Sequence, residues 1–185
     1  MNNRKKIGII KNKVLTRIII FLGGKMISLI LAAGKGTRMK SERSKVVHEV
    51  NGVPMVKMVS KLLKNAGIEK SIYILGHRME EVLNTIGEVE YVEQVEQLGT
   101  GHAVLIAKEK IEENKDDVLI TYGDTPLLRE ETINRMKEKF HNENLDCIIL
   151  SCNMKDPFAY GRIIKKDGNV VDIIEEKEAT EEQKK

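Results

Sequence analysis

Five cations and two glycines follow directly after an uncharged apolar stretch in the first quarter of the chain. The apolar stretch runs from Ile27 to Ala33, and residues 34–45 then carry Gly34, Gly36, five Lys or Arg and a single acid. Glycines let backbone N–H groups approach an anion, and Lys or Arg side chains neutralise its charge. The stretch indicates a phosphate-binding loop, and a tight turn before a solvated basic segment is the alternative that it leaves open by itself.

Two common phosphate-binding motifs do not fit this loop. A Walker loop needs a glycine, four residues and then Gly-Lys-Ser/Thr, a pattern that no segment supplies. A dinucleotide fingerprint needs three spaced glycines and an acid at the end of the second strand, whereas AAGKGTRMK has two glycines and SIYILGH ends in glycine and histidine. The small residues Ala32 and Ala33 would let a flat base lie against the backbone.

A carboxylate follows a second apolar stretch, in the segment YGDTPL. Asp124 comes after the uncharged residues 118–123, and Pro126 ends the extended run. Mg²⁺ prefers one or two carboxylates together with phosphate oxygens, so Asp124 is a candidate ligand. An Asp that forms a turn and caps the next helix is the alternative. His77 and His102 are more typical of structural hydrogen bonds than of bases, and phosphate chemistry by positioning and charge neutralisation needs no nucleophile and base pair.

The elements that must position these residues alternate short apolar runs with amphipathic stretches. This order predicts an α/β fold with a doubly wound, mainly parallel Rossmann-like sheet. The expected strands are 27–33, 71–77, 88–94, 117–124 and 145–152, and the expected helices are 54–67, 78–87, 102–114 and 129–140. Asp167 and Gly168 lie between two alternating segments, which predicts a β-hairpin near the C-terminus.

In open α/β sheets, ligands bind outside the carboxyl ends of the strands, where backbone amides and helix N-termini face outward. The first four expected strands all end in, or are followed by, glycine with polar or charged neighbours. The residues concerned are Gly34 to Arg38, then Gly76 and His77, then Gln94, Gln97 and Gly99 to His102, and finally Tyr122, Gly123 and Asp124. Glycine with polar or charged neighbours at all four strand ends is more than loop formation alone requires, so these residues are candidates for a binding site.

Length and composition point to one globular domain of ordinary size. The 185 residues include two cysteines, Cys147 and Cys152, without the spacing of a zinc or disulfide framework, which favours a reducing cytoplasmic setting and small buried core residues. Seven of the 31 Lys and Arg lie in residues 1–25, which hold no acid, so the rest of the chain sets 24 cations against 28 acids. This balance and the 4% aromatic content argue against a nucleic-acid-binding surface.

The first 25 residues have a basic start and an apolar centre but do not fit a targeting signal. Arg17 interrupts the apolar centre, no small-residue cleavage site follows, and no run approaches the length of a membrane span. The residues LGGK before Met26 can be encoded by a purine-rich ribosome-binding sequence. We therefore expect Met26 to be the biological start and residues 1–25 to be a non-native or disordered leader.

Four segments taken together are far more specific than any one of them. LAAGKGTRMKSERSKVVH, EQLGTGHAV, YGDTPL and YGRII…IIEEKEAT resemble the uridylyltransferase domain of the bacterial bifunctional N-acetylglucosamine-1-phosphate uridylyltransferase / glucosamine-1-phosphate acetyltransferase family. The resemblance covers almost all of residues 27–180. It implies a nucleotide-diphospho-sugar transferase type of fold and, with Mg²⁺, transfer of UMP from UTP to N-acetylglucosamine 1-phosphate. The products would be pyrophosphate and UDP-N-acetylglucosamine, a precursor of peptidoglycan and lipopolysaccharide.

The resemblance also implies roles for individual residues. Arg38 would contact the leaving pyrophosphate and Lys45 the nucleotide phosphates, which makes both catalytic, and Asp124 would bind Mg²⁺. The other expected substrate contacts are Leu31, Ala32, Ala33 and Gly34 at the uridine end, Gln94, Gly99 and Thr100 around the uracil, Tyr122 and Gly123 in the same site, and Gly161 and Glu175 at the N-acetylglucosamine moiety.

The chain departs from the family pattern in two places. Ser44 stands where the family usually has proline, which we expect to loosen the loop and leave Lys45 in place. The chain stops at Lys185, so we expect an incomplete nucleotidyltransferase domain over 26–185, without the later Asn-containing sugar segments or the β-helix acetyltransferase domain through which the family trimerises. The alternatives are a non-catalytic nucleotide-binding fragment and a pyrophosphorylase for another sugar 1-phosphate, although QLGTGHA favours the N-acetylglucosamine branch.

Overall fold

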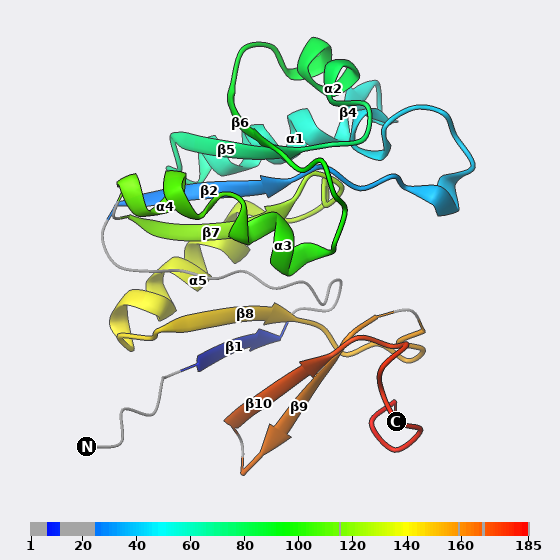
Figure 1. Cartoon of the computed structure of the whole chain (residues 1–185). Coiled ribbons are helices and arrows are strands. Elements are labelled where there is room, and N and C mark those ends of the chain that lie inside the picture. The colour runs from blue at the N-terminus through cyan, green and yellow to red at the C-terminus, as the bar shows by residue number, and fades with distance from the viewer. Residues whose placement is uncertain (1–6, 12–24, 115, 159, 168, 185) are drawn as a thin grey trace. The chain divides into compact units, whose positions relative to one another are not determined.

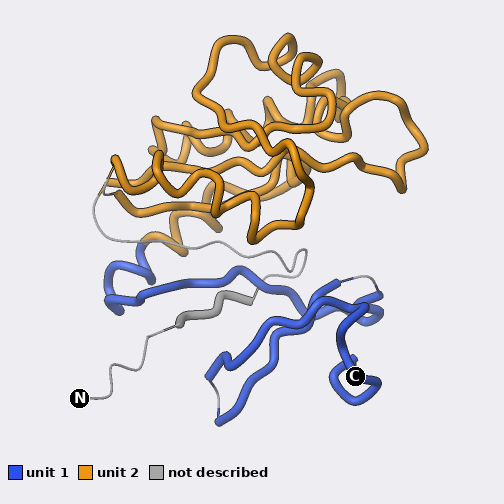
Figure 2. The backbone as a smooth tube through the Cα atoms, in the orientation of Figure 1, with its two compact units in different colours: residues 1–19, 138–185 blue, residues 20–137 orange. Residues whose placement is uncertain are grey.

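The computed structural model describes residues 7–11, 25–114, 116–158, 160–167 and 169–184 (Figure 1). The chain divides into two compact units, shown in different colours in Figure 2. The larger unit consists of residues 20–137, and the smaller unit combines residues 1–19 with residues 138–185. None of the helices within the described ranges is both long and apolar enough to cross a membrane.

The larger unit is built on a four-stranded parallel sheet with the order β6-β5-β2-β7. Its strands are β2 (Met26–Leu31), β5 (Lys70–Leu75), β6 (Glu90–Glu93) and β7 (Asp117–Tyr122). The central strand β2 and the edge strand β7 are almost entirely buried, as expected for apolar strands that are covered on both faces. β2 has no charged residue, and β7 has only Asp117, at its start. The predicted mainly parallel, doubly wound sheet is therefore confirmed.

Helices cover both faces of this sheet (Figure 1). The short helices α3 (Thr100–Leu105) and α4 (Lys108–Asn114) lie on one face, where Ala103 and Ala107 join a buried cluster with Leu29, Ile72 and Ile120. The other face carries α1 (Met55–Asn65) and the first turns of α5 (Glu130–Asn142). Helix α2 (Met79–Ile86) follows β5.

The single helix expected over 102–114 is wrong, because the structure has two helices there. The Ala107 N–H donates to the Val104 carbonyl over 3.1 Å, an i to i+3 bond that tightens the chain between α3 and α4. Ala107 is fully buried against the sheet. The continuous amphipathic pattern thus concealed a break at which the chain turns to bury a small residue.

Short elements link β2 to α1. The 3₁₀ turns η1 (Thr37–Met39) and η2 (Lys45–Val47) lie in the loop after β2, and the strands β3 (Glu49–Val50) and β4 (Val53–Pro54) form a tight antiparallel hairpin. Asn51 and Gly52 both have positive φ, as a two-residue hairpin turn requires.

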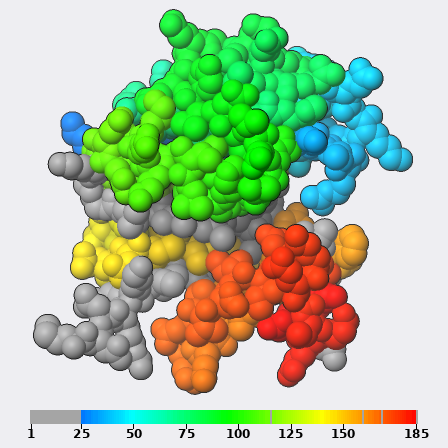
Figure 3. Space-filling view, viewed as in Figure 1, coloured from blue at the N-terminus to red at the C-terminus, as the bar shows by residue number. Residues whose placement is uncertain are grey.

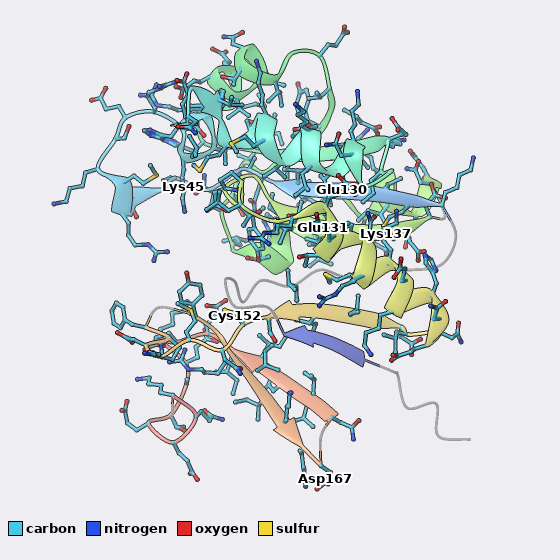
Figure 4. All side chains as sticks on the ribbon, turned by 180° about the vertical axis from the view of Figure 1, so that it is seen from behind. Lys45, Glu130, Glu131, Lys137, Cys152 and Asp167 are labelled. Carbon is cyan, nitrogen blue, oxygen red and sulfur yellow. The ribbon has the colours of Figure 1, made fainter. Side chains whose placement is uncertain are left out.

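The smaller unit contains two separate strand pairs. Strand β8 (Cys147–Ser151) pairs in parallel with β1 (Ile7–Lys11), and not with any described strand of the four-stranded sheet. The other pair, β9 (Arg162–Lys166) and β10 (Asn169–Ile174), is the predicted antiparallel hairpin, which is confirmed. Figure 4 labels Asp167 at its tip, where φ is 50°, while Gly168 lies outside the described residues.

The expected leader, residues 1–25, falls largely outside the described residues. Within it the structure describes Lys25 and the five residues of β1. Because β1 lies ahead of Met26, the strand that it adds to β8 would belong to the leader. The assignment of Met26 as the start stays a prediction.

Candidate functional site

Backbone hydrogen bonds continue the pairing of β2 with β5 and β7 to the first residues after β2 and β7, at the carboxyl edge of the sheet. The Ala32 N–H donates to the Ile74 carbonyl over 2.9 Å. On the other side of β2, the Gly123 N–H donates to the Leu31 carbonyl, also over 2.9 Å, and Tyr122 is the register partner of Leu31. The parallel strands therefore bring these predicted nucleotide residues to one edge, as expected for an open α/β sheet.

The loop after β2 turns at Gly36 and returns to the sheet at Lys45. Gly36 has φ 61° and ψ 33°, a left-handed conformation that glycine adopts at little cost. A Cβ atom at this position would lie 2.7 Å from Lys45 Cβ, so the glycine lets the loop close onto the stem of the lysine. The light-blue atoms of this loop stand out from the body of the larger unit in Figure 3, and Arg38 is exposed there.

The predicted phosphate ligand Lys45 and the predicted metal ligand Asp124 form an ion pair. Lys45 Nζ lies 2.5 Å from Asp124 Oδ2, and the two side chains are 32% and 11% exposed. Lys45 lies at the start of η2. Figure 4 labels Lys45 where the loop returns to the sheet. Lys45 and Asp124 lie 79 residues apart in the sequence, and the fold brings their charged groups into direct contact.

Close packing of small residues holds this pair in place. A Cβ atom on Gly123 would lie 3.0 Å from Val46 Cγ1 and 3.4 Å from Ala32 Cβ. Val46, next to Lys45, is 5% exposed, so η2 lies tightly against the loop after β7. Gly123 therefore permits the approach that places Lys45 beside Asp124.

The loop after β6 contributes an amide side chain. Gln94 is 5% exposed, and its Nε2 donates to the Gly99 carbonyl over 3.2 Å and lies 3.1 Å from His102 Nδ1. Gly99 has φ 97° and precedes Thr100, which begins α3 and is exposed. The structure thus brings Gln94, Gly99 and Thr100 together, while their role at the uracil stays a prediction. His102 makes a structural contact here.

Gln97, which follows an expected strand, makes a contact that the sequence did not predict. Its Nε2 donates to the Ala33 carbonyl over 2.9 Å, which ties the loop after β6 to the loop after β2. Close beside it, a Cβ atom on Gly76 would lie 2.8 Å from the Gln94 carbonyl oxygen and 3.0 Å from Ala33 Cβ. Gly34 follows Ala33 and is exposed. The only sequence signal for Gln97 was its place after an expected strand.

The two predicted sugar contacts lie in the smaller unit. Gly161 precedes β9, and a Cβ atom on it would lie 3.3 Å from the carbonyl oxygen of Ile174, the residue before Glu175. The Glu175 carbonyl accepts hydrogen bonds from the N–H groups of Glu178 and Ala179, over 2.9 and 3.0 Å. The hairpin thus brings Gly161 and Glu175 close together.

The donor set at the sheet edge fits a hard divalent cation that completes its shell with a ligand. Among the described residues there is no group of three or more His, Cys, Asp or Glu side chains that could hold a metal ion by itself. Asp124 supplies one partly buried carboxylate beside the loop of glycines and cations. A single carboxylate with nucleotide phosphates is the coordination that Mg²⁺ commonly takes, so the residues present fit such an ion.

An acid that the sequence analysis missed holds the residues before Lys45. Glu81, in the first turn of α2, accepts a hydrogen bond from the Ser44 N–H over 2.8 Å and one from Arg43 Nε over 3.2 Å. Nothing in the sequence pattern linked Glu81 to this loop. We expected Ser44 to loosen the loop, yet it is fully buried, and its N–H has a partner that proline could not have.

The parallel sheet, the glycine-rich edge and the Lys45–Asp124 pair are typical of an α/β domain that binds nucleotides. The family model of the MobA-like NTP transferase domain matches residues 28–170, and the chain belongs to this family. Its nucleotidyltransferase class, predicted from the sequence, is confirmed.

Curated relatives agree with the resemblance found in the sequence. The chain is 48% identical over 162 residues to "Bifunctional protein GlmU" of Caldanaerobacter subterraneus subsp. tengcongensis and 45% identical over 161 residues to the protein of that name from Thermoanaerobacter pseudethanolicus. Each match covers 86% of this chain and 35% of the relative, so the chain spans about a third of their length.

Solved structures share the fold. A putative glucose-1-phosphate thymidylyltransferase from Bacillus anthracis, in complex with a sucrose, has a TM-score of 0.64 at 21% identity, covering 81% of this chain and 64% of that chain. Rv0371c from Mycobacterium tuberculosis, in a complex with manganese, has a TM-score of 0.52 at 18% identity, covering 63% of this chain and 59% of that chain. At these identities the likeness concerns the fold alone.

Proposed function

We propose that this chain transfers UMP from UTP to N-acetylglucosamine 1-phosphate, which gives UDP-N-acetylglucosamine and pyrophosphate. The observation that carries the proposal is the Lys45–Asp124 pair at the carboxyl edge of the sheet, next to the glycine-rich loop. The four sequence segments and the relatives named GlmU support the choice of substrates.

The chemistry needs two polyanions to be held in line. The phosphate oxygen of the sugar phosphate attacks the α-phosphorus of UTP, a new P–O bond forms, and pyrophosphate leaves with the electrons of the broken bond. Lys45 and Arg38 offset the repulsion between the two substrates and the charge that develops in the transition state. The residues Leu31 to Gly34 and Gln94, Gly99 and Thr100 would orient the uridine, with Tyr122 and Gly123 beside them.

Asp124 would hold Mg²⁺, which would supply charge neutralisation at the nucleotide phosphates. In the structure the same carboxylate pairs with the Lys45 ammonium. Lys45, no longer paired with that carboxylate, would turn its ammonium toward the nucleotide phosphates. Asp124 and Lys45 would thus exchange partners when the substrates bind.

The sugar contacts and the setting extend the proposal. Gly161 and Glu175 would contact the N-acetylglucosamine moiety, and residues 26–185 would form part of a nucleotidyltransferase domain. The relatives and the two cysteines support a cytoplasmic location, and the resemblance supports trimer formation through a domain outside this sequence.

A pyrophosphate-release assay with UTP, Mg²⁺ and N-acetylglucosamine 1-phosphate tests the proposal. We expect release that depends on both substrates, falls at least about 100-fold in Asp124→Asn, and is lower with glucose 1-phosphate. Glu130→Gln, an exposed acid at the start of α5, is the matched control and should keep full activity. UTP binding without any pyrophosphate release would overturn the transferase and favour a non-catalytic nucleotide-binding role.

A further inference from the structure

Glu81, in helix α2, accepts a hydrogen bond from the backbone N–H of Ser44, the residue immediately before Lys45. Glu81 lies 37 residues after Ser44 in the chain. Its Oε2 accepts the Ser44 N–H over 2.8 Å, and its Oε1 lies 3.2 Å from Arg43 Nε. Ser44 is fully buried, and within the described part of the chain its Oγ has no hydrogen-bond partner. The loop is therefore anchored through the backbone N–H of Ser44 and not through its hydroxyl.

We propose that Glu81 is a positioning residue for Lys45, which it acts on through the Ser44 amide. This inference rests on the proposed function, because the effect of the contact is to place the Lys45 ammonium for the nucleotide phosphates. Glu81 would act through this backbone contact and would not touch the substrate itself.

The two contacts of the Glu81 carboxylate differ in how much they contribute to stability. The Arg43 side chain is 55% exposed, and an ion pair with so much solvent access contributes little. The Ser44 N–H is buried, so losing its charged acceptor leaves a donor without compensation, which is the costlier change. The backbone hydrogen bond from Ser44 is also the main cause that lowers the pKa of Glu81 below its ordinary value, so the carboxylate is charged at neutral pH.

Proline at position 44 provides a direct test. The Ser44 backbone has φ −57° and ψ 135°, which a proline ring can adopt. Ser44→Pro would fix the loop by its ring and would remove the N–H that Glu81 accepts. Glu81 should therefore matter with serine at position 44 and should be dispensable with proline there.

The experiment measures UTP dissociation constants of the whole chain by calorimetry. We expect Glu81→Ala to weaken UTP binding about 5- to 10-fold and Ser44→Pro to change it less than about 2-fold. Adding Glu81→Ala to Ser44→Pro should then cost less than about 2-fold. Glu80→Ala, an exposed acid in the same turn of α2, is the matched control and should stay within about 2-fold of the unaltered chain.

A second readout does not depend on the nucleotide. In Glu81→Ala, hydrogen exchange of the Ser44 amide, followed by NMR, should be at least about 10-fold faster, with the far-ultraviolet spectrum unchanged. Unchanged exchange, or an equal cost of Glu81→Ala in both backgrounds, overturns the inference.

A Lys45→Met variant separates this inference from the proposed function. If Lys45→Met weakens UTP binding and Glu81→Ala does not, only the positioning role of Glu81 is overturned. If Lys45→Met leaves UTP binding unchanged, the proposed phosphate role of Lys45 fails, and the inference fails with it.

Discussion

The ion pair between Lys45 and Asp124 places opposite charges where a nucleotide and its cation would each need one partner. The pair is partly buried, so solvent and salt screen it less than a pair on the open surface, and it is still open to exchange. The ammonium therefore competes with any divalent cation for the carboxylate. Metal affinity and nucleotide affinity should respond in opposite directions to the loss of this one side chain.

Replacing Lys45 by Met tests that competition. Without nucleotide, Mn²⁺ should bind about 5-fold more tightly, since the cation no longer displaces an ammonium worth about 1 kcal/mol. UTP should bind about 10- to 100-fold more weakly, because a charge-assisted contact to phosphate is lost. Paramagnetic resonance of free Mn²⁺ measures the first effect and calorimetry the second. If Lys45→Met weakened the binding of Mn²⁺ and of UTP equally, the proposed competition would be wrong.

Cys147 illustrates how burial controls the reactivity of a single side chain. Burial raises the pKa of its thiol, and the neighbouring Asp146 carboxylate adds to this. A higher pKa means less thiolate at a given pH, so Cys147 should react with iodoacetamide more slowly than a free cysteine at pH 8, and its rate should level off at higher pH. Mass spectrometry of the alkylated peptides measures the rate. A rate equal to that of free cysteine would show that the thiol is not shielded.

Among the elements, the loop after β2 depends on the backbone conformation of one residue, Gly36. Gly36→Ala combines a positive φ with a Cβ atom that would lie 2.7 Å from Lys45 Cβ. The loop must shift, so UTP binding should weaken about 10-fold or more. Gly87→Ala, also at positive φ but with open space around it, is the control and should leave UTP binding unchanged. An unchanged UTP dissociation constant for Gly36→Ala would contradict the role of this turn.

The strands themselves derive their stability from the buried face. Ile72 is fully buried at the centre of β5, so Ile72→Ala should lower the free energy of unfolding by about 3 kcal/mol, measured by urea denaturation. Val95→Ala removes a side chain that is 80% exposed and should change the free energy of unfolding by less than about 0.5 kcal/mol. If both variants lowered the free energy of unfolding by similar amounts, Ile72 would not be part of the stabilising core.

How well the sequence predicted each element depended on how far apart in the chain its contacts lie. The apolar runs of β2 and β7 predicted a parallel sheet, and the loops after these two strands bring Lys45 and Asp124 together at one edge of it. The break at Ala107 was hidden because a kinked pair of helices has nearly the same apolar spacing as one helix. The contact of Glu81 with Ser44 joins positions 37 residues apart through a backbone N–H, which leaves no trace in residue type.

At the scale of the whole molecule, the predicted nucleotide-binding residues and the β1–β8 strand pair belong to different units. All predicted nucleotide and metal residues, from Leu31 to Asp124, belong to the unit of residues 20–137, whereas β1 pairs with β8 in the other unit. A chain that begins at Met26 would keep the first set and lose β1.

Such a chain should bind UTP with the affinity of the full chain. Its β8 amides should exchange hydrogen faster, because the strand would lose the partner that pairs with Cys147 to Ser151. Hydrogen exchange of peptides covering residues 147–151, with a peptide from β2 as the internal control, measures this difference. Unchanged exchange in β8 would mean that residues 7–11 add nothing to this strand, and weaker UTP binding would mean that the nucleotide edge depends on residues before Met26.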